Sequence, residues 1–231
     1  LGPLHASGAK VVVVPPDPER IVAAVTPRTR LLALSHVLWT TGQVLPVHEL
    51  KEHTGLPILV DGAQSVGAIP VDAARLDFTT ISGQKWLCGP EATGALVVAE
   101  PDTLRVARPS YFSQQEHRPD GAFVPKPGAG RFDPNWGPSA LLSGLRAALD
   151  AQPEWRFDRA AEMAERCREL LADAGADVIV PEERATLVSW RAPVEESAAV
   201  VIRLAEAGVI VRDLAGRGLV RASVGWWTSD E

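Results

Sequence analysis

Short apolar segments alternate with longer, more polar ones along the first hundred residues, and this alternation constrains the fold more than any other feature of the sequence. Each apolar segment has four to six residues, which suits a buried strand, and Pro, Gly or polar residues bound it. We expect strands at residues 11–14, 31–35, 56–60, 77–81 and 94–99, with helices at 18–25 and 47–53. Strands that alternate with helical crossovers predict an α/β fold with a mainly parallel sheet.

The second half of the chain has a different pattern. Residues 101–138 are rich in Pro, Gly, Arg and aromatic residues and show little periodicity, which is typical of a long functional loop region. Beyond it we expect helices at 139–149, 158–174 and 195–207 and strands at 177–180, 186–190, 209–212 and 220–223. The sequence therefore predicts two domains: a large one over residues 1–137, and a linking helix with a smaller α+β domain over 138–231.

Composition and charge exclude several classes of protein. The chain of 231 residues has 23 Lys plus Arg against 29 Asp plus Glu, a formal net charge of −6, and no basic block. Nucleic acid and anionic membranes are therefore not expected as partners. No apolar run approaches the ~20 residues of a membrane-spanning helix. Cys88 and Cys167 form no metal-binding or disulfide pattern, so we expect a cytoplasmic protein without a metal site.

Polar side chains follow two of the expected strands at the points where those strands end. Asp61 follows the third apolar segment, and Ser82, Gln84 and Lys85 follow the fourth. The carboxyl ends of parallel strands meet at one edge of a sheet, where ligands collect. A lysine and a carboxylate at such an edge suit pyridoxal phosphate (PLP), which needs an amine for its aldehyde and an acid opposite its pyridine nitrogen. The alternatives are that Asp61 caps a helix and that Lys85 is a solvated surface residue.

Five stretches of the chain carry a resemblance to a known family. They read VDGAQS at 60–65, ISGQKW at 81–86, SHVLWTTGQVLP at 35–46, RFD at 131–133 and VRAS at 220–223. Together they resemble the class V, fold-type I PLP enzymes, which include cysteine desulfurases, cyst(e)ine C–S lyases, isopenicillin N epimerase and class V aminotransferases. The resemblance implies a seven-stranded-type PLP large domain that is incomplete here because its N-terminal part is missing. It also implies a smaller α+β C-terminal domain and a homodimer.

The resemblance assigns four residues to the cofactor ring. Lys85 would form the internal aldimine with PLP and move the proton of the substrate's Cα. Asp61 would pair with the pyridine nitrogen. Gln64 would hydrogen-bond the phenolic oxygen, and Ala63 would pack under the ring.

The resemblance also assigns the phosphate and the substrate. Ser82 would bind the phosphate, and Gln84 stands where the family commonly has a phosphate-contacting His. Arg221 would hold the α-carboxylate of an amino-acid substrate with its planar guanidinium, and Trp39 would border that substrate. The alternative for Arg221 is a structural ion pair, and the alternative for Trp39 is a purely structural packing role.

Two departures from the family pattern guide the choice of reaction. The family's RFExGT motif reads RFDPNW at 131–136. Cysteine desulfurases carry a sulfur-accepting Cys shortly before the carboxylate-binding Arg, whereas residues 212–219 contain no Cys. We therefore expect a PLP-dependent lyase that breaks a C–S bond of a sulfur-containing amino acid. A class V aminotransferase or amino-acid epimerase is the alternative among enzymes, and a non-catalytic remnant of the PLP fold that serves as a dimerisation module is the alternative of another class.

Overall fold

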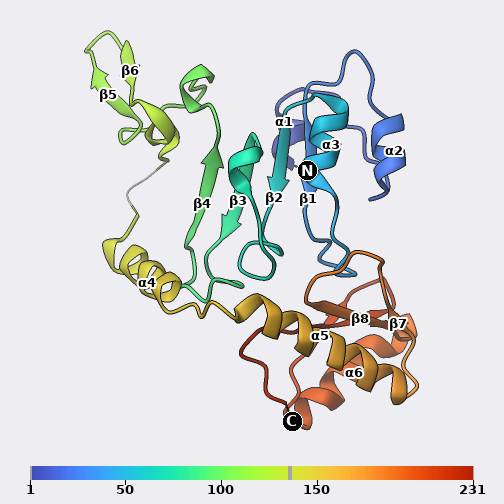
Figure 1. Cartoon of the computed structure of the whole chain (residues 1–231). Helices are drawn as coiled ribbons and strands as arrows, with labels where there is room; N and C mark the ends of the chain where they lie inside the picture. The colour runs from blue at the N-terminus through green and yellow to red at the C-terminus, as the bar shows by residue number, and fades with distance from the viewer. Residues whose placement is uncertain (1, 135–136, 231) are drawn as a thin grey trace.

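The computed structural model describes residues 2–134 and 137–230, and two four-stranded sheets organise them (Figure 1). The first sheet has the order β1-β2-β3-β4, with β1 at Leu32–Ser35, β2 at Ile58–Asp61, β3 at Phe78–Ser82 and β4 at Gly94–Val98. Strands β1, β2 and β3 are parallel, and β4 runs antiparallel to β3. The expected α/β class with a mainly parallel sheet is confirmed, and four strands of that sheet lie in the part of the chain that the structure describes.

The core of the first sheet follows from its apolar alternation. Ile58 and Val60 of β2 are completely buried. Helix α2 (Pro18–Ala23) begins at Asp17, whose carboxylate accepts a 3.0 Å hydrogen bond from the Arg20 N–H, and α3 (Val47–Thr54) ends at Gly55 in the left-handed conformation. Both helices contribute apolar side chains to one cluster with β1 and β2. A short helix, α1 (Gly2–Ala6), precedes them.

The strand expected at residues 11–14 is wrong. These residues have no regular secondary structure, and Val12 and Val13 are 61% and 70% exposed. Only Val14 packs against the core cluster of the first sheet. A run of β-branched residues becomes a strand when a neighbouring strand accepts its hydrogen bonds, and no described strand pairs with this segment.

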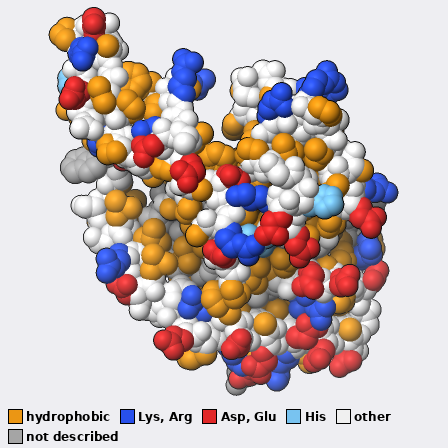
Figure 2. All heavy atoms as spheres, turned by 45° about the horizontal axis from the view of Figure 1, so that its top comes forward, with side chains coloured by type: hydrophobic (Ala, Val, Ile, Leu, Met, Phe, Trp, Pro, Cys, Tyr) orange, Lys and Arg blue, Asp and Glu red, His pale blue; other side chains and the backbone are white. Residues whose placement is uncertain are grey.

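The segment expected as a long loop contains a small hairpin. Strands β5 (Gln114–His117) and β6 (Phe123–Pro125) pair antiparallel and project from the rest of the molecule (Figures 1 and 2). Arg131 is buried beneath this region and pairs with the Asp102 carboxylate. The last two positions of the departing RFDPNW motif, 135 and 136, lie outside the described residues.

The second sheet has the antiparallel order β7-β8-β10-β9. Its strands are β7 (Val178–Ile179), β8 (Leu187–Arg191), β9 (Arg212–Leu214) and β10 (Leu219–Ser223), and helices α5 (Arg156–Asp173) and α6 (Val194–Glu206) pack on them. The expected α+β unit is confirmed. The strand expected at 209–212 starts later, because the Val209 N–H still bonds the Leu204 carbonyl at the end of α6 and pairing with β10 begins only at Arg212.

The two sheets are joined directly, and α4 (Ser139–Asp150) connects them along the chain. Figure 1 shows the carboxyl ends of β2 and β3 pointing toward the second sheet. The Ala185 N–H donates a 2.8 Å bond to the carbonyl of Gly42, where a Cβ would collide with the Leu187 carbonyl oxygen, so this contact requires glycine. Leu145 of α4 packs beside the turn that follows β3, and the expected domain boundary between residues 137 and 138 stays a prediction.

Candidate active site

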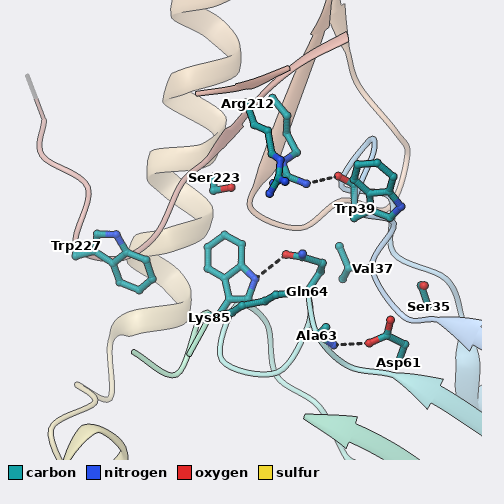
Figure 3. A pocket seen from close by; sticks show the side chains of 12 residues that line it. Ser35, Val37, Trp39, Asp61, Ala63, Gln64, Lys85, Arg212, Ser223 and Trp227 are labelled. Carbon is teal, nitrogen blue, oxygen red and sulfur yellow. Dashed lines mark hydrogen bonds between the residues drawn. The ribbon is translucent and has the colours of Figure 1, made fainter. Parts of the chain in front are cut away.

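A cavity of about 550 Å³ lies where the carboxyl ends of β1 and β2 face the second sheet (Figure 3). It is lined by residues that come from both sheets: Ser35, Val37, Trp39, Asp61, Ala63, Gln64, Lys85, Trp86, Arg212, Arg221, Ser223 and Trp227. Six of the eight site residues expected from the sequence therefore meet in one cavity. Ser82 and Gln84 are not among the lining residues, and their contact with a phosphate stays a prediction.

Asp61 is the last residue of β2 and presents its carboxylate to the cavity. Its Oδ1 accepts a 2.9 Å hydrogen bond from the Ala63 N–H, and the Thr80 hydroxyl of β3 lies 3.5 Å from the same oxygen. The residues that follow form turns and no helix, so Asp61 is not a helix cap. The turn fixes one carboxylate oxygen and leaves Asp61 without an ion-pair partner among the described residues.

The loop after β2 packs against the turn after β3. The Trp86 indole N–H donates a 3.1 Å hydrogen bond to Oε1 of Gln64. Gly67 has φ +91°, and a Cβ on it would lie 2.8 Å from the backbone carbon of Trp86. This close approach holds Gln64 beside Lys85 on one wall of the cavity, as Figure 3 shows.

Lys85 lies in the tight turn that follows β3. The Cys88 N–H bonds the Lys85 carbonyl at 2.9 Å, and the Gly89 N–H bonds the Gly83 carbonyl at 2.8 Å. The side chain is exposed and lines the cavity. It forms no ion pair with any described residue, so its amine is available to a ligand.

Arg221 faces Lys85 and Asp61 from the second sheet. Its side chain is buried, and Nη1 donates a 2.6 Å hydrogen bond to the carbonyl of Trp39, whereas its Nε has no partner among the described residues. Burial lowers the pKa of the Arg221 guanidinium from its usual range, and the nearby charge of Arg212 lowers it further. A structural ion pair, the alternative for Arg221, is not present in the described structure.

Sequence reasoning missed three lining residues. Arg212, Ser223 and Trp227 reach the cavity because the turn between β9 and β10 sets which side chains face the first sheet. Trp227 is stacked in a chain of aromatic rings, 6.0 Å from the Trp86 ring and 5.5 Å from the Trp226 ring. The two adjacent Trp residues near the C-terminus were a visible signal for this wall, but no sequence pattern marks Arg212.

His36 lies directly behind the cavity. Its backbone N–H donates a 3.1 Å hydrogen bond to the Asp61 carbonyl, and its side chain is buried. Burial lowers the pKa of His36 to about 4, with a smaller contribution from His48. The imidazole is therefore neutral at physiological pH.

The cysteines do not reach this cavity. Cys88 is exposed in the turn after Lys85, Cys167 is half-buried on α5, and neither lines the cavity. Partial burial raises the pKa of both thiols, with Arg168 opposing the effect at Cys167. Within the described residues, no group of three or more His, Cys, Asp or Glu side chains could hold a metal ion.

The molecular surface adds two observations. Figure 2 shows acidic and basic side chains intermingled on the face in view, with no large basic patch there. None of the described helices has the length and apolar character needed to cross a membrane.

Comparisons with known proteins agree with this geometry. The family model for aminotransferase class V matches residues 4–225. Isopenicillin N epimerase from Streptomyces clavuligerus is 33% identical over 207 residues, which cover 78% of this chain and 52% of that protein. The chain therefore spans about half the length of this relative.

Solved structures give the same result. A cysteine desulfurase from Thermococcus onnurineus superposes with a TM-score of 0.79 at 23% identity, covering 92% of this chain and 58% of that one. The cystine C–S lyase C-DES, in complex with its product cysteine persulfide, superposes with a TM-score of 0.78 at 28% identity, covering 92% and 61%. The expected fold and the expected cofactor, PLP, are confirmed, and the chain belongs to the class V aminotransferase family of PLP-dependent enzymes.

Proposed function

We propose that the protein acts on the Cα of an amino acid with PLP as cofactor, and that it breaks a C–S bond of a sulfur-containing amino acid by elimination. The observation that carries this proposal is that Asp61, Lys85 and Arg221 line one cavity. Asp61 and Lys85 follow neighbouring parallel strands, and Arg221 faces them from the second sheet. An acid, an amine and a guanidinium are the three groups that this chemistry needs.

The lining residues fit PLP by the chemistry of their donors and acceptors. Asp61 would hold the pyridine nitrogen protonated, and Lys85 would hold the aldehyde carbon. Because Trp86 occupies Oε1 of Gln64, the amide N–H₂ of Gln64 is the group left to donate a hydrogen bond to the ring's phenolic oxygen. When bound, PLP supplies an electron sink for the charge left on Cα.

Two side chains would act on the substrate. Lys85 Nζ would take the proton from Cα, since it is the amine that lines the cavity. Arg221 keeps donors free beyond its bond to Trp39, and these would hold the α-carboxylate. Trp39 would cover the substrate from the side of β1.

The proposed elimination differs from desulfurase chemistry in where the sulfur goes. A desulfurase transfers sulfur to a protein thiolate, and no described thiol lines this cavity. The sulfur would therefore leave with a fragment of the substrate. The likeness to the cystine C–S lyase structure supports this reaction. We also propose that the intact protein is a homodimer, as the family resemblance implies.

A second candidate is amino-acid epimerisation. The 33% identity to isopenicillin N epimerase over 207 residues favours it. The first step at Lys85 would be the same, and the proton would then return to the opposite face of Cα. An aminotransferase would instead pass the amino group to a keto acid.

The test uses the intact protein with PLP and either L-cystine or L-cysteine. Elimination predicts pyruvate and ammonia, and Lys85→Ala should abolish both. Hydrogen exchange at Cα in D₂O, measured in parallel, reports the proton step alone. Exchange with loss of optical purity and no keto acid would favour the epimerase, and no exchange with any amino acid would support a non-catalytic dimerisation module.

A further inference from the structure

Two arginines lie directly opposite each other on the wall of the cavity. Arg212 of β9 pairs in register with Arg221 of β10, and both side chains line the cavity. Figure 3 shows their guanidinium groups side by side. Like charges directly opposite on an antiparallel pair are destabilising, so this arrangement needs a compensating partner.

The described residues do not supply that partner. Neither Arg212 nor Arg221 forms an ion pair with any described carboxylate. Asp61 is the one carboxylate among the lining residues, and Lys85 adds a third cation. Other buried arginines of the chain do have carboxylate partners: Arg131 pairs with Asp102, and Arg168 pairs with Glu165.

We infer that the substrate carries a second acidic group, which Arg212 binds while Arg221 holds the α-carboxylate. This inference rests on the proposed function. It assigns the substrate to amino acids whose side chain ends in a carboxylate or a comparable anion. Arg212 thereby becomes a specificity-determining residue.

The depth of the two arginines orders the two ends of such a substrate. Arg221 is buried and Arg212 is exposed, so the α-carboxylate would lie deep and the distal acid would lie at the rim. Trp39 and Trp227 are partly exposed lining residues, and their ring faces suit an apolar spacer between the two acids. A dianionic ligand would neutralise both guanidinium groups at once, with bidentate contacts available to each.

The first test needs no cofactor chemistry. The quenching of tryptophan fluorescence would report binding of glutarate and of pentanoate, two five-carbon acids that differ in the second carboxylate, because Trp39, Trp86 and Trp227 line the cavity. We expect the protein to bind glutarate about tenfold more tightly, the ratio that one charge-assisted hydrogen bond supplies. Arg212→Gln should remove this preference and leave pentanoate binding unchanged.

Three variants separate the possible outcomes. Arg212→Lys keeps the charge and should retain part of the preference. Arg191→Gln removes an exposed arginine of the same sheet that does not line the cavity and should change nothing. Arg221→Gln should weaken the binding of both acids. Equal affinity of the unaltered protein for glutarate and pentanoate, or a preference that survives Arg212→Gln, would overturn the inference.

A second arm measures the holoenzyme with L-glutamate and L-norvaline, whose side chains differ in the terminal carboxylate. Hydrogen exchange at Cα should have a lower KM with L-glutamate, and Arg212→Gln should raise that KM toward the L-norvaline value without changing kcat for L-norvaline. If exchange fails with every amino acid while the glutarate preference persists, the proposed function is wrong and the paired-arginine site stands. If exchange occurs and the carboxylate preference is absent, only the inference about the second acid is wrong.

Discussion

Arg221 donates a 2.6 Å hydrogen bond from Nη1 to the carbonyl oxygen of Trp39, a residue 182 positions earlier in the chain. This bond ties the second sheet to the loop that follows β1. The Ser189 hydroxyl adds a 2.7 Å bond to the carbonyl of the neighbouring Thr40. The cavity is therefore created by the docking of the two units, and the arginine proposed to bind substrate also supports that docking.

Arg221→Gln should lower the free energy of unfolding by about 2 kcal/mol, because it removes a buried, charge-assisted hydrogen bond. Arg212→Gln is the matched control on the opposite strand. It should leave stability unchanged or raise it by about 0.5 kcal/mol, since it removes a like-charge pair. Urea unfolding of the three proteins measures both effects. Equal losses in the two variants would contradict a docking role specific to Arg221.

Asp61→Asn should separate folding from chemistry. The amide retains an oxygen that accepts the Ala63 N–H, so the unfolding free energy should change by less than about 0.5 kcal/mol. The charge opposite the pyridine nitrogen is lost, and the rate of Cα hydrogen exchange should fall about 100-fold. Thr80→Val, which removes the 3.5 Å hydroxyl contact to Asp61, is the control and should retain most of the rate. A fully active Asp61→Asn variant would contradict the role of Asp61.

Gly67→Ala should destabilise the protein by about 3 kcal/mol, because it adds a backbone conformation that L residues avoid to a clash with Trp86. Gly55→Ala offers a matched control, since Gly55 has φ +62° and nothing lies within 4 Å of an added Cβ. That variant should lose only about 1 kcal/mol, the cost of the left-handed conformation alone. Chemical unfolding compares the two, and similar losses would show that the contact between the two loops is not tight.

His36 should make stability fall as the solution is acidified. Its pKa is about 4 in the folded protein, because of burial and then His48, and near 6.5 when unfolded. Between these values the unfolded chain binds the extra proton, so stability is lost as pH falls from about 6.5 toward 4. From pH 7 to pH 5 the loss is up to roughly 2 kcal/mol.

His36→Gln provides the control for this pH dependence. All other titrating groups remain, so the difference between the two pH profiles isolates His36. Urea unfolding at pH 7 and pH 5 should show a smaller loss in the variant. Parallel profiles for the two proteins would contradict the assignment to His36.

The site residues that the sequence predicted best are those fixed by strand topology. Asp61 and Lys85 follow adjacent strands that are parallel, and the carboxyl ends of parallel strands share an edge, so their meeting was predictable. The position of Arg221 was predictable only through family resemblance, because its contact with Trp39 is a tertiary contact between two units. Arg212 was not predictable, since its register opposite Arg221 depends on the turn between β9 and β10.

The errors in secondary structure have the same cause. The β-branched run at 11–14 has strand propensity but no partner strand among the described residues. The strand expected at 209 begins at Arg212, because the end of α6 takes the intervening backbone groups first. Local composition indicates the type of element, whereas pairing decides whether and where it forms.

The most direct test asks which lysine binds the cofactor. The chain has four lysines, Lys10, Lys51, Lys85 and Lys126, and only Lys85 lines the cavity. The protein is mixed with PLP, treated with borohydride to fix any bond between amine and aldehyde, digested, and examined by mass spectrometry. We predict one pyridoxyl phosphate group, on the peptide that contains Lys85, and none on Lys85→Ala. Labelling of another lysine in preference to Lys85, or no labelling of the intact protein, would contradict the account.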